Sequence, residues 1–208
     1  RSLTWRPVVR SLVLLALLLA SLPADEAAPR FALDDLQRAA ADHPHLRITF
    51  RQIKDLELFD RPVVTDGVLE ISRPLGSVRW EFSGRSILVL RDGRLQRWNA
   101  EGGRETVRAG PASQALVGQM QALLSGDWRS LDELFRISLD PGGAPAVSLV
   151  PRDDDLKRYL SAIEVVFHDD LTAPRELTIR APGGDQTRYE FDRPQRPDGL
   201  AATRFAGP

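Results

Sequence analysis

The spacing of apolar residues changes from a helical to a strand-like period near the start of the chain. Within residues 33–43 the apolar side chains share one helical face, two aspartates stand in the first turn, and Pro44 follows. Acidic residues suit a helix N-terminus and proline stops a helix, so this segment is predicted to be helical. After it, apolar residues alternate with polar ones, as in strands that bury one face. The alternating runs are Ile48/Phe50, Val78/Trp80/Phe82, Phe135/Ile137/Leu139, Val147/Leu149, Ile163/Val165/Phe167, Leu177/Ile179 and Tyr189/Phe191.

Turn residues separate these runs at intervals of roughly ten residues. The separators are Asp66-Gly67, Asp92-Gly93, Gly102-Gly103, Pro141-Gly142-Gly143 and Gly183-Gly184-Asp185. Ten or eleven short strands at about this spacing indicate an antiparallel sheet that curls or closes.

One segment interrupts the predicted strands. Residues 112–124 carry a helical apolar stripe, Ser125-Gly126-Asp127 follows it, and residues 128–134 have the pattern of a further short helical turn. The sequence therefore predicts a mainly β protein with helices, in one domain over residues 25–208. The tail from about residue 194 is rich in proline, glycine and arginine, so we expect it to be loosely ordered.

The first 24 residues have the layout of a secretory signal peptide. Three arginines precede an apolar run over residues 12–22, which ends at Pro23-Ala24. The run is too short to span a bilayer comfortably, although an uncleaved membrane anchor is the alternative. Cleavage after Ala24 would remove three arginines and change the formal charge from −1 to −4. We expect a protein exported from the cytoplasm.

Composition excludes several kinds of chemistry. The 208 residues include three histidines and no cysteine, which excludes disulfides, thiolate metal sites and a cysteine nucleophile. A net charge of −1 does not favour nucleic-acid binding. With 42% hydrophobic and 27% charged residues, the chain has the composition of a globular protein.

Three polar clusters are candidates for chemistry, and each has a plainer interpretation. His43 and His45 could bind a metal or could flank the end of a helix. Asp153-Asp154-Asp155 could bind a divalent cation or form a solvated turn, and His168-Asp169-Asp170 fits a general base or a hairpin. The sequence contains no motif for a serine hydrolase, phosphate loop or zinc protease. We therefore predict no enzyme activity, no cofactor and no metal.

A large curled sheet without catalytic groups is more naturally a container for an apolar ligand. Trp80, Phe82 and Met120 are side chains suited to an adaptable apolar lining. The alternative is that these residues form an ordinary core.

Several short segments follow one another along the chain in a recognisable order. They are Phe50-Arg51-Gln52-Ile53-Lys54, residues 67–74 with Trp80, residues 86–89 with Asp92-Gly93, residues 95–99 and residues 147–152. Taken together, over roughly residues 33–192, these segments resemble the LolA family of periplasmic lipoprotein carriers, whose motifs F-x-Q, G-x-L-x-x-x-R-P followed by W, and L-x-P occur in the same order. One extra residue lies between Pro74 and Trp80, and the lid helix cannot be matched residue by residue.

The resemblance implies an incomplete antiparallel barrel of about eleven strands, closed by a helical lid over a cavity that holds acyl chains. It implies that Arg73 latches the lid by bonding to its backbone. A guanidinium suits this role because it offers five donors in a rigid fork. The alternative is a solvated arginine at a strand end marked by Pro74. The implied lining comprises Phe50, Leu69, Val78, Trp80, Phe82, Leu88, Leu116 and Met120.

The implied function is carriage of a lipoprotein, or another acylated lipid, through the periplasm between an inner-membrane donor complex and an outer-membrane acceptor. We expect a monomer that does not bind nucleic acid. One alternative is a lipid-sensing or adaptor subunit of an envelope complex that transfers nothing. Another is an acyl hydrolase that uses one of the few histidine or aspartate candidates.

Overall fold

The computed structural model describes residues 31–105, 122, 126–140 and 143–208. The predicted signal peptide over residues 1–24 lies outside the described residues. So does the predicted helix over 112–124, apart from residue 122, and with it Leu116 and Met120. No helix in the described ranges is both long and apolar enough to cross a membrane.

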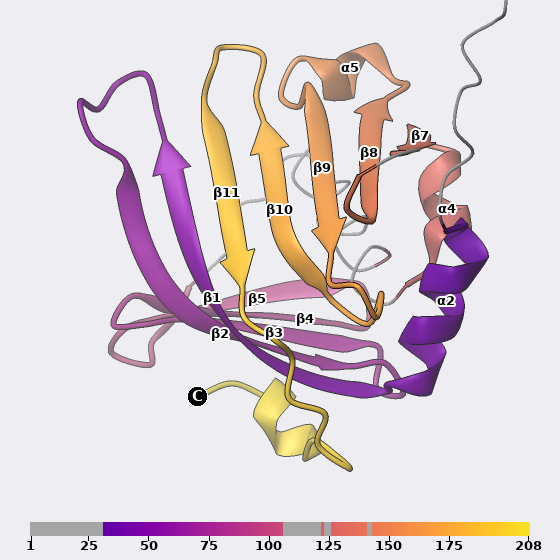
Figure 1. Cartoon of the computed structure of the whole chain (residues 1–208). Coiled ribbons are helices and arrows are strands. Elements are labelled where there is room, and N and C mark those ends of the chain that lie inside the picture. Colours follow the sequence, from indigo (N-terminus) through magenta and orange to yellow (C-terminus); the bar gives the residue numbers. More distant parts are fainter. Residues whose placement is uncertain (1–30, 106–121, 123–125, 141–142) are drawn as a thin grey trace, which may run out of the picture.

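The described chain builds one antiparallel sheet of eleven strands in the order β6-β5-β4-β3-β2-β1-β11-β10-β9-β8-β7. Its two outer strands do not pair, so the barrel is incomplete, and the predicted fold class is confirmed (Figure 1). The curved open sheet is called the half-barrel below. The strands are β1 (His45–Asp55), β2 (Val63–Ser72), β3 (Ser77–Phe82), β4 (Ser86–Arg91), β5 (Arg94–Asn99), β6 (Arg104–Glu105), β7 (Phe135–Leu139), β8 (Ala146–Pro151), β9 (Ala162–Phe167), β10 (Pro174–Arg180) and β11 (Gln186–Phe191).

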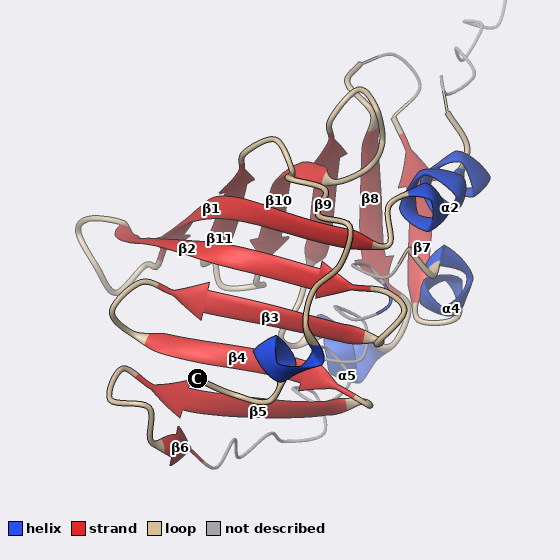
Figure 2. Cartoon of the chain, turned by 90° about the horizontal axis from the view of Figure 1, so that it is seen from below, coloured by secondary structure: helices blue, strands red, loops and turns tan. Residues whose placement is uncertain are grey.

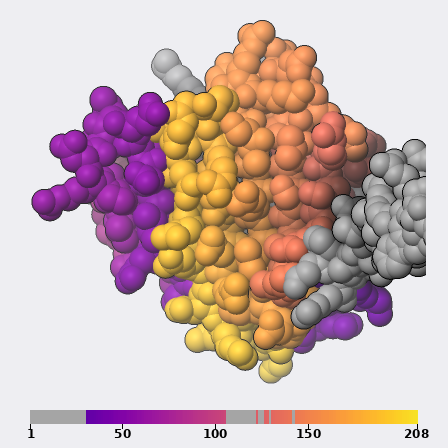
Figure 3. Space-filling view, turned by 45° about the horizontal axis from the view of Figure 1, so that its top comes forward, coloured from indigo at the N-terminus to yellow at the C-terminus, as the bar shows by residue number. Residues whose placement is uncertain are grey.

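Pairing of β1 with β11 joins the two halves of the sheet. Phe50 lies opposite Phe191, and Gln52 lies opposite Tyr189. On the molecular surface, the purple N-terminal strands accordingly lie beside the yellow β11 (Figure 3). The first and last strands along the chain thus pair at the centre of the half-barrel.

The helices begin where the sequence supplies caps. In α2 (Leu33–Asp42) the Asp35 carboxylate accepts from the Ala32 N–H at 2.7 Å, and Pro44 follows the helix. The short helix α4 (Trp128–Asp132) follows Asp127, which caps it. In α5 (Asp154–Lys157) the Asp153 carboxylate accepts from two backbone N–H groups. The aspartate run over 153–155 is therefore the start of a helix, as side chains with this capping preference favour.

One predicted turn is wrong and another is confirmed. Asp92 and Gly93 both have positive φ, 50° and 69°, and form the tight connection between β4 and β5. Asp66-Gly67, by contrast, lies inside β2. Gly67 is needed there because a Cβ would overlap the Phe50 ring and the Glu81 carbonyl oxygen. Close backbone approach, not a turn, explains this glycine.

The C-terminal segment packs against the outer face of the half-barrel, contrary to the expected loose tail. Its 3-10 helix η1 (Ala202–Phe205) lies over β3 and β4 (Figure 2). Phe205 is buried with Val89 and Trp98, in an apolar cluster separate from the main core. Composition favoured disorder, but Phe205 gains enough burial against these outward-facing residues to fix the segment.

Buried charge also holds this segment. The Glu70 side chain is only 2% exposed on the outer face of β2, and it accepts from Arg204 at 2.9 Å and from Arg47 at 3.2 Å. Arg79, also buried, donates to the carbonyl oxygens of Arg204 at 3.1 Å and Gly207 at 2.8 Å. A buried carboxylate must be paired to persist. The network therefore ties the C-terminal segment to β1, β2 and β3.

Candidate functional site

The inner face of the half-barrel consists of rows of side chains that run across neighbouring strands. Nearest α2, Leu46 on β1 lies opposite Ile71 on β2, and the next row pairs Ile48 with Leu69. All four side chains are buried in the main core. These rows continue onto β3 and β4 with Val78, Trp80, Leu88 and Leu90.

The next row is aromatic. The Phe50 ring lies 5.4 Å from Phe82 and 6.1 Å from Phe191, measured between ring centroids. Gly67 lies between Phe50 and Phe82 in the register and leaves room for the rings. Tilted and edge-on rings at these distances attract one another beyond the area that they bury.

The row after the aromatic one is polar. Gln52 on β1 lies between Thr65 on β2 and Tyr189 on β11, and the Gln52 amide donates to the Tyr189 hydroxyl. Gln52 is 6% exposed and Thr65 is 8% exposed. Burial raises the pKa of Tyr189 above its usual value, and the Gln52 hydrogen bond opposes that shift. The inner face thus passes from apolar to aromatic to polar toward the end of β1.

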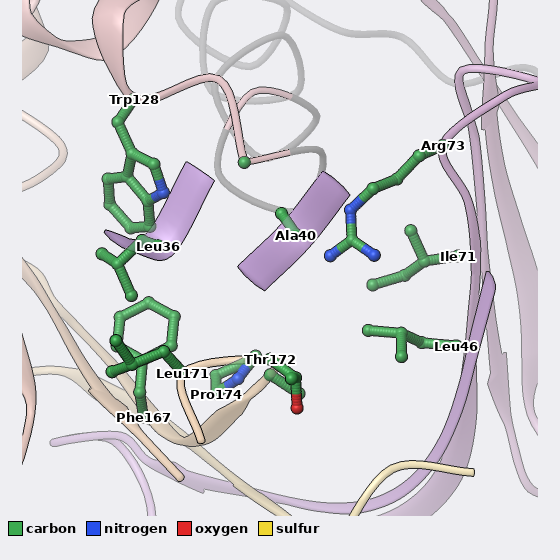
Figure 4. A pocket seen from close by; sticks show the side chains of 12 residues that line it. Leu36, Ala40, Leu46, Ile71, Arg73, Trp128, Phe167, Leu171, Thr172 and Pro174 are labelled. Carbon is green, nitrogen blue, oxygen red and sulfur yellow. The ribbon is translucent and has the colours of Figure 1, made fainter. Parts of the chain in front are cut away.

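At the opposite end, helices α2 and α4 cover the core. Leu36 of α2 and Trp128 of α4 are both buried, and the Trp128 ring lies edge-on to Phe167 at 5.8 Å. Gly126 lies so close to Ala40 that no Cβ would fit between them. A cavity of about 20 Å³, with room for roughly one water molecule, remains beneath α2 (Figure 4).

Arg73 follows β2 and lines this cavity, and its guanidinium points toward α2 (Figure 4). It donates to the carbonyl oxygen of His43, the residue that caps the C-terminal end of α2. Its backbone N–H donates to the Pro44 carbonyl oxygen at 2.9 Å. Burial lowers the pKa of Arg73 to about 10, and within the described residues its buried Nε has no hydrogen-bond partner. A cation near the carbonyl end of a helix is favourable, so Arg73 can hold α2 against the sheet.

The family's sequence pattern for the outer membrane lipoprotein carrier protein LolA matches residues 44–207. The chain belongs to the LolA family. The match begins at the end of α2 and includes the whole half-barrel and the C-terminal segment. It supports a lipoprotein- or lipid-binding fold of the carrier type. None of the curated proteins compared with this LolA-family chain matches it significantly.

Solved structures with similar folds have low sequence identity to this LolA-family chain. A DUF1329 family protein from Desulfovibrio piger is 10% identical with a TM-score of 0.50, over 83% of this chain and 95% of that one. A putative outer membrane lipoprotein-sorting protein domain from Vibrio parahaemolyticus is 11% identical with a TM-score of 0.44, and the match covers 83% of this chain and 95% of that one. A chain of the Pseudomonas aeruginosa MucA/MucB complex is 15% identical with a TM-score of 0.43, and the match covers 83% of this chain. This chain spans only 59% of the chain matched there.

The structure places most of the lining residues implied by the LolA resemblance on one face. Phe50, Leu69, Val78 and Trp80 are buried in the main core, and Phe82 and Leu88 are half-buried against it. Leu116 and Met120 lie outside the described residues. That these side chains line a ligand cavity stays a prediction.

Sequence reasoning missed the polar row and the helix contacts at the site. Gln52 and Tyr189 stand at inward positions of alternating runs. A polar side chain among inward apolar residues was therefore the sequence feature that could have predicted the polar row. The packing of Trp128 on Phe167 had no sequence signal, because these residues belong to separate elements. Within the described residues, no group of three or more histidine or acidic side chains is placed to hold a metal.

Proposed function

We propose that this LolA-family protein is a periplasmic carrier of acylated cargo. It holds the acyl chains of a lipoprotein, or of another acylated lipid, against the inner face of the half-barrel. The proposal includes export through the predicted signal peptide, loading by an inner-membrane donor complex and unloading to an outer-membrane acceptor. It assigns no catalytic step, since the family is named for carriage of lipoproteins.

One observation carries this proposal: the apolar face of an open sheet is covered by helices, not by closing strands. Strands β6 and β7 do not pair, while α2 and α4 bury Leu36 and Trp128 on the core. Moving a helix exposes apolar surface without breaking the ladders of the sheet. An acyl chain could then replace the helix side chains on the same rows.

The free energy of moving an acyl chain out of a membrane sets how much apolar burial this surface must supply. Each methylene that leaves a membrane loses about 0.8 kcal/mol of burial, so a soluble carrier must rebury the chain almost completely. The rows that include Leu46, Ile48 and Phe50 are buried and uncharged. They can therefore offer an acyl chain an environment close to that of the bilayer.

The contact from Arg73 to α2 can balance the closed and open positions of this helix. A hydrogen bond from a charged donor contributes about 1.5–3 kcal/mol, and the cost of burying the guanidinium opposes it. The smaller net contribution that remains holds α2 closed when no cargo is bound, yet cargo that binds the open state can shift the equilibrium. In this proposal Arg73 is the latch.

The test is to ask whether the purified protein binds acyl chains. Organic extracts of the protein are analysed by mass spectrometry, and a fluorescent fatty-acyl probe is titrated into delipidated protein. We expect co-purified lipid, or saturable probe binding that quenches or shifts tryptophan emission. If extracts contain no lipid and the probe does not bind, the carrier proposal is wrong.

Transport needs a second measurement. A labelled lipoprotein in donor membranes is mixed with acceptor membranes, with and without the protein. Protein-dependent movement of label is expected for a carrier. Acyl binding without movement would instead favour the alternative, a lipid-sensing or adaptor subunit that transfers nothing.

A further inference from the structure

We propose that Gln52 and Tyr189 form a subsite for the acyl carbonyl group of the cargo, which is the ester or amide group at the head of each acyl chain. The inference rests on the proposed function, because it assigns the polar end of the same binding surface. It also gives a role to the glutamine of the F-x-Q motif, which the apolar lining leaves unexplained.

The order of rows along β1 carries the argument. Leu46, Ile48 and Phe50 form successive apolar rows from the α2 end, and Gln52 is the next inward residue. Two positions further, Lys54 ends this face near the end of the strand. The polar row therefore lies between the apolar rows and the rim. An acyl chain laid along β1 would bring its carbonyl group to Gln52.

The hydrogen-bonding capacity of the pair fits a carbonyl acceptor. One Gln52 amide hydrogen is used on the Tyr189 hydroxyl oxygen, which leaves the other amide hydrogen and the phenolic proton available. Among the described residues, no acceptor for the Tyr189 hydroxyl proton is found. A phenol is protonated at neutral pH, and burial raises the pKa of Tyr189 further, so its hydroxyl can donate.

The surroundings favour a neutral acceptor that arrives with an apolar chain. The Tyr189 ring stacks on Phe191 at 6.0 Å and lies 5.7 Å from Phe50, so the hydroxyl stands at the edge of the aromatic row. Tyr189 is partly buried, and a cargo chain that removed its hydroxyl from water without supplying an acceptor would bind at a cost, so the site discriminates against ligands that lack one. An ester or an amide meets this need, and a hydrocarbon does not.

The experiment compares three ligands that differ only at the head of the chain: methyl dodecanoate, N-methyldodecanamide and tetradecane. Each displaces a fluorescent acyl probe from wild-type protein, Tyr189→Phe and Gln52→Leu. Tyr159→Phe is the matched control, because Tyr159 is 65% exposed near α5. Wild type and the control are expected to prefer the ester and amide over tetradecane.

Loss of one donor should weaken ester and amide binding about fivefold to tenfold in Tyr189→Phe, with tetradecane unchanged. Gln52→Leu should act in the same direction. Tyr189→Phe keeps the ring that stacks on Phe191, so it is expected to fold, and circular dichroism checks this. Equal binding of all three ligands by wild type, or an unchanged preference in both variants, overturns the subsite alone. Failure of wild type to bind any of the three overturns the proposed function as well.

Discussion

The guanidinium of Arg73 bonds to the main-chain carbonyl of His43, so a side chain that follows β2 caps the end of α2. The two residues are close because the Arg73 backbone N–H also donates to the carbonyl oxygen of Pro44, the residue just before β1. The contact therefore links the covering helix to the strands beneath it. In the proposed mechanism, this contact sets how often α2 leaves the core.

We predict that Arg73→Leu increases the opening of α2 more than it lowers global stability. The hydrogen bond to His43 is lost, but so is the cost of burying a cation whose pKa has fallen to about 10. Hydrogen exchange should therefore quicken in the α2 amides by about tenfold, while the urea midpoint changes little. Arg73→Lys should be intermediate, because an ammonium lacks the planar fork.

Arg94→Leu is the control for this prediction, since Arg94 is exposed at the connection between β4 and β5. Its α2 exchange rates should match those of wild type. Unchanged α2 exchange in Arg73→Leu would remove the latch from the proposed mechanism.

We predict that Glu70→Gln destabilises the protein by about 3 kcal/mol, as expected when one member of a buried charge network is neutralised. Arg79 would remain buried, and Arg204 would lose its 2.9 Å partner. The free energy of unfolding in urea measures the effect. Glu190→Gln removes a carboxylate from an exposed pair with Arg188, so its effect should stay below about 1 kcal/mol. Equal effects of the two substitutions would contradict the assigned role of Glu70.

Local patterns predicted those strands in which buried side chains alternate with more exposed ones. The alternation through Ile48 and Phe50, or through Ile163 and Val165, requires no knowledge of the partner strand. Long-range contacts were not predictable in this way. Glu70 and Arg204 are far apart in the sequence, and nothing near either residue indicates that the C-terminal segment returns to β2. The resemblance to a family, more than any pattern, selected Arg73 and the lining.

Gly67 shows the limit of local rules within a single strand. The Asp-Gly pair has the composition of a turn, yet the residue is fixed in β2 by the space that the Phe50 ring occupies. We predict that Gly67→Ala lowers stability by about 1–3 kcal/mol, because neither the ring nor the Glu81 carbonyl on β3 can easily give way. Gly199→Ala is the control, as nothing lies within 4 Å of a Cβ there. A Gly67→Ala variant as stable as wild type would disprove this account of the close packing.

The last prediction concerns the ionisation of Tyr189 at alkaline pH. The chain contains two tyrosines, so absorbance of tyrosinate can be assigned with single variants. Burial raises the pKa of Tyr189, and we expect a tyrosinate step above the ordinary range that Tyr189→Phe abolishes and Tyr159→Phe keeps.

A raised folded-state pKa means that the folded protein holds this proton more tightly than the unfolded chain. The corresponding stability is complete below the unfolded pKa of about 10 and is lost as pH rises through the folded pKa. Wild-type stability should therefore fall more steeply than that of Tyr189→Phe above pH of about 10, measured by urea unfolding. Parallel pH profiles for the two proteins would show that burial does not hold the Tyr189 phenol neutral.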